Sequence, residues 1–280
     1  MNNLTLIHKV SLFTLLLILT GFSSCTHTYY APSEPLALDL IEQHDLQATV
    51  GYGKINGNDH LNLQLAYSPL KHLGVGLTHF KVYPQKTPNN KFNEAHGHLT
   101  EFYLGAYSYK GTPIYADDKL EMGSGITVSG YLGYGRGYVK NYYEQRTLFS
   151  DVVENATLEF DFRKYFVQGG LSWRREIIKM GLLAKVGVLD YRKGIQQGAI
   201  MDAPLRDFER LESGDPYRFI ELTYNFEIGM RQARLYTNFT LSDINMVPKS
   251  LYESTLFRMG LVFDIDDFFR KRPSTKKQKI

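Results

Sequence analysis

The chain is poor in cysteine: Cys25 is the only one among its 280 residues. A single thiol has no partner within the chain, which excludes an internal disulfide bond. Long hydrophobic runs are equally scarce. The longest, residues 10–19, has about half of the roughly 20 apolar residues that a membrane-spanning helix needs. These absences exclude a disulfide-stapled domain and a helical membrane protein.

A basic surface is missing as well. Six of the 32 lysines and arginines lie in the tail 270–280, and the chain without that tail and Lys9 has 25 basic and 29 acidic residues. Nucleic-acid binding needs basic residues gathered on the folded domain, whereas here they gather at one end. The sequence therefore predicts no nucleic-acid partner, and a basic periplasmic tail over residues 267–280.

The N-terminus has the features of an export signal. Lys9 precedes the apolar run, and small residues follow the run at Gly21, Ser23 and Ser24. A positive start, a short apolar core and a small-residue cleavage site define a secretory signal peptide, predicted here over residues 1–24. Because Cys25 stands at the expected cleavage point, we expect it to carry a covalent lipid, with residues 25–45 as a lipidated tether. The alternative is a plain signal peptide with a leftover cysteine.

The body of the chain alternates between apolar and polar residues with period two, which is typical of strands with two unlike faces. In residues 218–230, RFIELTYNFEIGM, Glu221, Thr223, Asn225 and Glu227 share the polar face. The same pattern predicts ten strands, at residues 46–55, 60–68, 72–83, 98–109, 125–140, 156–174, 181–192, 217–230, 233–242 and 255–265. The predicted fold class is all-β. It is a single antiparallel up-and-down transmembrane β-barrel over residues 46–266, with eight or twelve strands as alternatives and no helices after the signal peptide.

The sixth of these strands changes phase. One face carries Leu158, Phe160 and Phe162, and the other then carries Tyr165, Val167, Leu171 and Trp173. One extra residue in a strand moves all later side chains to the opposite face. We therefore expect a bulge near Arg163 and Lys164.

The connections alternate in length. Those after even strands are short or moderate, as at 69–71, 176–180 and 231–233, apart from a longer one at 110–124. Those after odd strands are mostly long, as at 84–97, 141–155, 193–216 and 243–254. Bacterial membrane barrels have short periplasmic turns and long outer loops. The pattern predicts the bacterial outer membrane as location, with both chain ends periplasmic. The long loops, chiefly 193–216 and 141–155, are candidate contacts for a ligand or a protein.

Alternation alone fits a soluble β-domain, with its apolar face inside, or a membrane barrel, with that face outside. Two features favour the barrel. The polar faces are rich in Gly, Thr, Ser, Asn and Gln, and aromatic residues lie toward the ends of apolar faces, at Tyr52, Tyr67, Tyr134, Phe219 and Phe263. Such aromatic girdles mark the two surfaces of a bilayer. A soluble lipid-anchored β-domain remains the alternative.

The mature chain resembles the outer-membrane β-barrel proteins, and more narrowly the lipoprotein-type barrels common in Bacteroidota. The residues that carry the resemblance are SSC at 23–25, LQLAYSPLKHLGVGL at 63–77, SGYLGYGRGYVKN at 129–141 and DFRKYFVQGGLSWR at 161–174. These motifs consist of turn chemistry and barrel pattern. The resemblance implies a fold and a contact with outer-membrane lipid, and no activity.

Charged residues on the polar faces are the candidate site. They are Lys185, Glu221, Glu227, Arg234, Arg258 and Asp264. In a narrow barrel these side chains would face the lumen, where unpaired charges are costly. We expect them to pair and fill it, which predicts a structural or interaction barrel. The alternative is a small-solute pore.

Other candidate chemistry is weak. His96 and His98 could bind a metal but have no third ligand nearby, and Ser68 with His79 invites comparison with membrane-embedded lipid hydrolases without forming a triad. The glycines of residues 130–137 have the spacing of a glycine-rich phosphate-binding loop. Such a loop is followed by a helix, and the sequence predicts none here. The sequence predicts no enzyme, no cofactor and no metal site, with a membrane lipid hydrolase as the remaining alternative.

Overall fold

The computed structural model describes residues 29–36, 40–55, 58–83, 95–116, 119–146, 153–198, 208–212, 214–230, 232–245 and 252–265. The predicted signal peptide, Cys25 and the basic tail lie outside these residues, as do parts of the long connections. No helix within the described ranges has the length and apolarity needed to cross a membrane.

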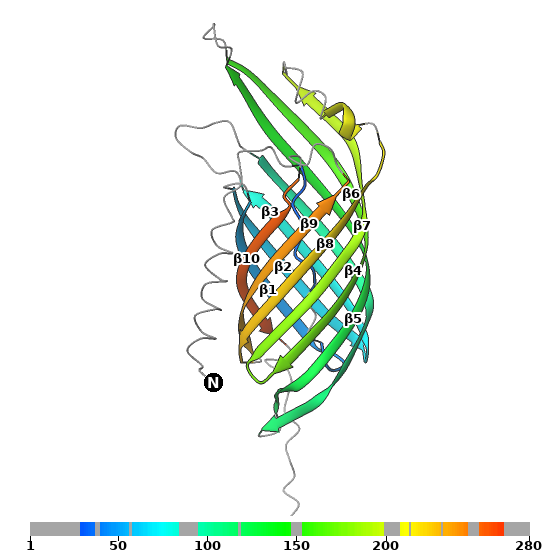
Figure 1. Cartoon of the computed structure of the whole chain (residues 1–280), viewed down its shortest axis with the longest axis vertical. Helices are drawn as coiled ribbons and strands as arrows, with labels where there is room; N and C mark the ends of the chain where they lie inside the picture. Colours follow the sequence, from blue (N-terminus) through cyan, green and yellow to red (C-terminus); the bar gives the residue numbers. More distant parts are fainter. Residues whose placement is uncertain are drawn as a thin grey trace, which may run out of the picture.

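Ten antiparallel strands form a closed barrel, in which each strand pairs with its neighbours in the chain and β1 pairs with β10 (Figure 1). The strands are β1 Leu46–Ile55, β2 Asn58–Leu70, β3 Leu73–Tyr83, β4 Ala95–Ala116, β5 Lys119–Arg146, β6 Val153–Arg175, β7 Ile178–Gln197, β8 Tyr217–Gly229, β9 Ala233–Ile244 and β10 Thr255–Asp264. The prediction of an all-β up-and-down barrel with ten strands is confirmed, and the alternatives of eight and twelve are excluded.

The two ends of the barrel differ. The connections β2–β3, β4–β5, β6–β7 and β8–β9 lie at one end, which we call the short-turn mouth. The others lie at the opposite end, the long-loop mouth. There β5 and β6 run on above the other strands (Figure 1), and β5 reaches 28 residues, beyond the predicted 125–140. Residues 208–212 add one short helical segment that the sequence does not predict.

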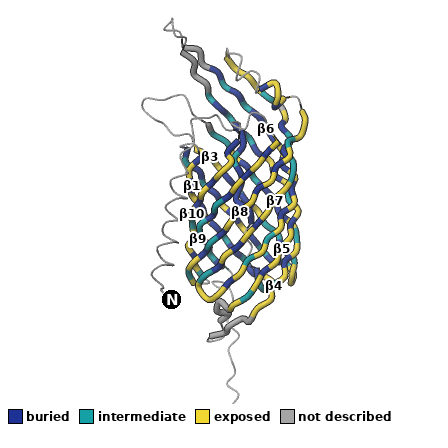
Figure 2. Tube along the Cα trace, viewed as in Figure 1, coloured by how far each residue is buried: buried dark blue, intermediate teal, exposed yellow. Residues whose placement is uncertain are grey.

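Over most of the barrel the apolar side chains face outward and the polar ones face the lumen. On β8, Leu222 is 42 % exposed while Thr223 next to it is 1 % exposed. The alternation of buried and exposed residues follows each strand across the wall (Figure 2). We call the outward set the apolar belt, and it includes one or more residues from every strand, such as Val50, Leu63, Leu77, Phe102, Leu132, Val167, Val186, Leu222, Leu241 and Met259.

Toward the long-loop mouth the two faces exchange character. On β6, Tyr165 faces outward, but two residues earlier the outward side chain is Arg163, and Phe162 faces inward. The bulge predicted near Arg163 and Lys164 is wrong, because β6 pairs with β5 without interruption there. The register shift against β7 lies earlier, between Glu159 and Asp161. The apolar residues of β6 thus change faces because the surroundings of each face change along the strand. The backbone pairing with β5 stays regular.

The same exchange occurs on every strand except β2, always near the long-loop mouth. The inward apolar residues there are Ile55, Phe80, Leu99, Val139, Phe160, Leu189, Phe219, Ile244 and Leu256. They form one hydrophobic cluster with Phe208 and Leu211 from the connection before β8. At the level of the apolar belt the interior is therefore polar and the outside apolar. Nearer the long-loop mouth the interior is an apolar core, as in a soluble protein.

Candidate functional site

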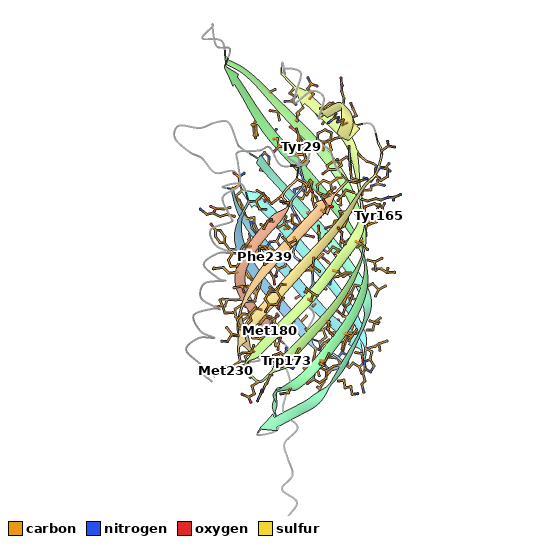
Figure 3. All side chains as sticks on the ribbon, in the orientation of Figure 1. Tyr29, Tyr165, Trp173, Met180, Met230 and Phe239 are labelled. Carbon is orange, nitrogen blue, oxygen red and sulfur yellow. The ribbon has the colours of Figure 1, made fainter. Side chains whose placement is uncertain are left out.

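The segment before β1 runs through the lumen. Tyr29 lies near the long-loop mouth (Figure 3), where its ring packs against Phe160 at 5.7 Å and its carbonyl accepts a 3.1 Å hydrogen bond from the Tyr191 hydroxyl. At the short-turn mouth, the amide of His44 donates to the carbonyl of Ser68 at 2.7 Å. We call residues 29–36 the plug. The sequence predicts a free tether here, whereas the structure places its described part inside the barrel.

Side chains of the wall hold the backbone of the plug. The Gln168 amide donates to the carbonyl of Leu36 at 3.0 Å, and Gln64 donates to the carbonyls of Glu34 and Pro35, each at 3.4 Å. Arg258 donates to the carbonyl of Pro32. Buried carbonyls need such partners because a missing hydrogen bond costs free energy. The lumen is therefore built to fit an extended peptide.

A cluster of four buried charges surrounds Ser33, and we call it the central cluster. The Lys164 ammonium lies 2.9 Å from Glu101 and 3.3 Å from Glu221, and the Lys185 ammonium lies 3.3 Å from Glu101. Both lysines donate to the Ser33 hydroxyl, at 3.0 Å and 2.9 Å, and that hydroxyl donates to Glu101 at 2.8 Å. The plug thus completes the charge network of the wall.

Aromatic rings enclose this cluster. Lys164 lies 4.7 Å from the ring centroid of Phe219, and Lys185 lies 4.7 Å from that of Phe166. A cation over an aromatic face is attracted by the ring, more strongly where water is excluded. The Tyr30 hydroxyl donates to Glu221. The two cations are therefore stabilised by acids and rings together.

Glu34 is the charged residue of the plug. Its side chain is 1 % exposed and accepts hydrogen bonds from Asn62 at 2.6 Å, from the Tyr236 hydroxyl at 2.9 Å and from Asn238. Three donors from two strands, β2 and β9, satisfy one buried carboxylate, as burial requires. This recognition is specific to an acid at this position.

A second ionic cluster lies toward the short-turn mouth. Glu227 accepts from Lys179 and from Arg234, each at 2.8 Å, and Arg234 also binds Asp264 at 3.0 Å. Gln47 donates to Asp264 at 2.9 Å, which ties β1 to this group. The charges on four strands of the wall are paired here without any contribution from the plug.

All six charged residues singled out from the sequence point into the lumen. Lys185 and Glu221 belong to the central cluster, Arg258 holds the plug, and the remaining three form the second cluster. Sequence reasoning missed Glu101, Lys164, Lys179, Ser33 and Glu34. Alternation could have indicated Glu101, which lies on the polar face of its strand, but Ser33 and Glu34 belong to a segment without periodicity.

A close approach at Gly51 allows the plug to fit. A Cβ atom there would lie 2.0 Å from the Tyr236 hydroxyl and 3.2 Å from Glu34. We therefore predict that Gly51→Ala breaks the Tyr236–Glu34 hydrogen bond and destabilises the barrel by about 1–3 kcal/mol. Urea unfolding of the refolded protein measures this. Gly130→Ala is the control, because its Cβ would have no atom within 4 Å, and equal losses in both variants would contradict the prediction.

The structure does not bring the other candidate residues together. Ser68 is buried and hydrogen-bonded to Tyr107 at 2.8 Å, whereas His79 bonds to Thr100 at 2.9 Å on the outer face. The rings of His96 and His98 pack against tyrosines of β5 on that same face. In the described part of the chain, no three His, Cys, Asp or Glu side chains gather closely enough to hold a metal ion.

The free space near the short-turn mouth is small. A shallow pocket there is lined by residues that include Ser129, Ser172, Lys179 and Asn225. Its polar lining belongs to the wall beside the second ionic cluster. The lumen at the level of the plug is occupied by the chain itself.

Comparison with known proteins adds no assignment to this geometry. The chain matches no protein-family model, and no curated protein sequence matches it significantly.

Proposed function

We propose that this protein is an outer-membrane β-barrel with a filled lumen and a structural or interaction role. The observation that carries the proposal is the apolar belt, which covers the outside of all ten strands while charged residues are buried inside. Soluble monomers rarely expose apolar patches of more than a few hundred Å². A bilayer supplies the apolar surroundings that such a belt needs, and closure leaves no unpaired strand edge in lipid.

The exchange of faces near the long-loop mouth supports the same proposal. Arg136 and Arg163 face outward on the strands whose belt residues are Leu132 and Val167. Water favours charged outer side chains and lipid favours apolar ones, so a strand that carries both contacts two different environments. The change is that expected where a barrel leaves the hydrocarbon and enters water, at the level of an aromatic girdle. Tyr134 and Tyr165 lie at this boundary, with ring centroids 5.2 Å apart.

The filled lumen favours a structural or interaction role over a pore. The plug and the central cluster occupy the interior, and their polar groups bond to one another. A small-solute pore would need a continuous path for water. Partner contacts would then involve the outer loops around 141–155 and 193–216.

Sidedness follows from the usual orientation of such barrels, with short turns in the periplasm. The C-terminal end of β10 and the basic tail are then periplasmic, but the plug begins at the outer mouth. Cys25 precedes Tyr29 by four residues, which span at most about 14 Å. A lipid on Cys25 would therefore lie nearer the outer mouth than the periplasmic one, unlike the location expected from strand number alone.

Heat-modifiable gel migration tests the membrane barrel. We expect the purified protein to need detergent for extraction and to migrate differently before and after boiling, since a folded barrel resists denaturation until heated. Extraction without detergent after removal of any lipid would support the soluble lipid-anchored domain.

A charge in the belt gives a sharper test. Leu222 is 42 % exposed and lies between Ala184 and Leu241 in the wall. We predict that Leu222→Lys destabilises the barrel in vesicles by about 2–4 kcal/mol, the cost of a lysine near the bilayer midplane. Urea titration of the barrel refolded in vesicles measures it.

Ile195→Lys is the matched control. Ile195 is 49 % exposed, yet it pairs with Glu159, above the belt. In water a surface substitution changes stability by about 0.5 kcal/mol or less, so the control should be nearly neutral. Equal, small effects for both lysines would mean that the belt does not face lipid.

A further inference from the structure

The outer surface changes abruptly across the strands β3 to β6. Leu77, Phe102, Tyr134 and Tyr165 form one cross-strand row of outward side chains, and the next row toward the long-loop mouth is His79, Thr100, Arg136 and Arg163. Two residues along each strand thus separate an apolar row from a polar one. The second row lies at the depth where lipid headgroups would meet the protein.

Arg136 and Arg163 face each other directly in this row. Both are exposed, and neither makes an ion pair with an acid among the described residues. Like charges directly opposite on one face of a sheet are destabilising. Two outward acids lie nearby. Asp190 stands directly opposite Arg163 on β7, where its carboxylate accepts from Arg192 at 2.6 Å, and Asp161 pairs in register with Tyr138 and Arg192. An anion from outside the chain would relieve the repulsion.

A third cation lies on the same surface. Lys81 is exposed on β3 and pairs with His98, which in turn pairs with Tyr138. Burial lowers the pKa of His98, so its ring is neutral near pH 7 and the charge comes from Lys81 and the two arginines. We call Lys81, Arg136 and Arg163 the cationic patch.

We propose that the cationic patch binds the phosphate-bearing headgroup of an anionic lipid in the leaflet at the long-loop side. This inference rests on the proposed membrane location. Arginine binds phosphate through two parallel hydrogen bonds, and two neighbouring guanidinium groups can share one phosphate. Tyr134 and Tyr165, whose rings are tilted at 52° to each other, lie in the row below the arginines, where the glycerol or sugar and the upper acyl chain of the lipid would lie.

Continuity with the belt identifies a lipid, and not free phosphate, as the ligand. The arginines continue the outward faces of β5 and β6, whose next belt residues are Leu132 and Val167. A ligand bound there meets cations at its head and apolar side chains along its tail. Inorganic phosphate would use only the cations, in a site open to water and salt.

The experiment is a titration of the full chain in non-ionic detergent with a short-chain phosphatidic acid, followed by native mass spectrometry. We expect the double variant R136Q/R163Q to bind the lipid at least tenfold more weakly than the natural protein. The matched control is K54Q/R218Q, which removes two exposed cations on β1 and β8, away from the cationic patch, and should change the affinity less than twofold.

Each other outcome overturns the proposal. Equal weakening in both double variants would mean that binding depends only on net charge. Unchanged binding in R136Q/R163Q would mean that the lipid does not bind at these arginines. If inorganic phosphate at millimolar concentration competes with an affinity equal to that of the lipid, the cationic patch is a site for free anions. Heat-modifiable migration of all variants shows that they fold, and it separates a failure of this site from a failure of the membrane location.

Discussion

Replacing Glu101 with glutamine is expected to destabilise the folded barrel by about 3–5 kcal/mol, because it leaves buried positive charge without compensation. Glu101 is fully buried and contacts both Lys164 at 2.9 Å and Lys185 at 3.3 Å. After the substitution, Glu221 alone would balance two ammonium groups. Glutamine keeps the size of the side chain, so the loss would report charge and not volume.

The measurement is urea unfolding of the refolded barrel, with Glu159→Gln as the control. Glu159 accepts from Lys140 at 2.6 Å near the long-loop mouth, where both side chains are partly exposed. The hydrogen bond from Lys140 lowers the pKa of Glu159, yet an ion pair in contact with water contributes only about 0–1 kcal/mol. Similar losses in the two variants would mean that water reaches the central cluster and that the lumen is not closed.

The strands were predictable because period-two alternation is a local signal. All ten were found, and β1 matches its predicted range of 46–55. The orientation of the faces agrees with the prediction too, since Leu222 is exposed while Thr223 and Glu227 are buried. The extensions of β4 to β7 were missed because beyond the belt both faces mix polar and apolar residues, and alternation no longer separates strand from loop.

The plug could not be predicted for a related reason. Its contacts are remote in sequence: Lys164 lies 131 residues from Ser33, and Asn238 lies 204 residues from Glu34. The segment has no regular secondary structure, so its side chains follow no period. Two prolines and a lack of alternation describe a free linker and an extended peptide inside a barrel equally well. Only the position of the wall donors distinguishes them.

The phase change of β6 shows how a correct observation gave a wrong prediction. A switch of apolar residues from one face to the other implies a bulge only if the surroundings of each face are constant along the strand. Here Phe160 and Phe162 pack in an apolar core while Tyr165 and Val167 belong to the belt. The surroundings change along β6, and the backbone pairing with β5 stays regular.

Deleting residues 29–40 is expected to convert the closed barrel into a conducting one. The deletion removes Ser33 and Glu34 from the charge network, and it removes Tyr29 and Tyr30 from the apolar cluster at the long-loop mouth. The wall charges it leaves behind, chiefly Lys164 and Glu221, are stable only if water replaces the plug. We expect discrete single-channel steps in planar bilayers from the deletion variant and none from the natural protein.

Two comparisons make this result specific to the plug. Ser33→Ala loses hydrogen bonds of the plug but keeps its backbone contacts with Gln64 and Gln168, so this variant should stay closed. A synthetic peptide with the sequence of residues 29–40 should block the deletion variant, because the wall binds the plug mainly through its carbonyls and through Glu34. The same peptide with glutamine in place of Glu34 should block less well. If the deletion variant folds, as heat-modifiable migration would show, and still does not conduct, the wall side chains close the lumen on their own and the plug only stabilises them.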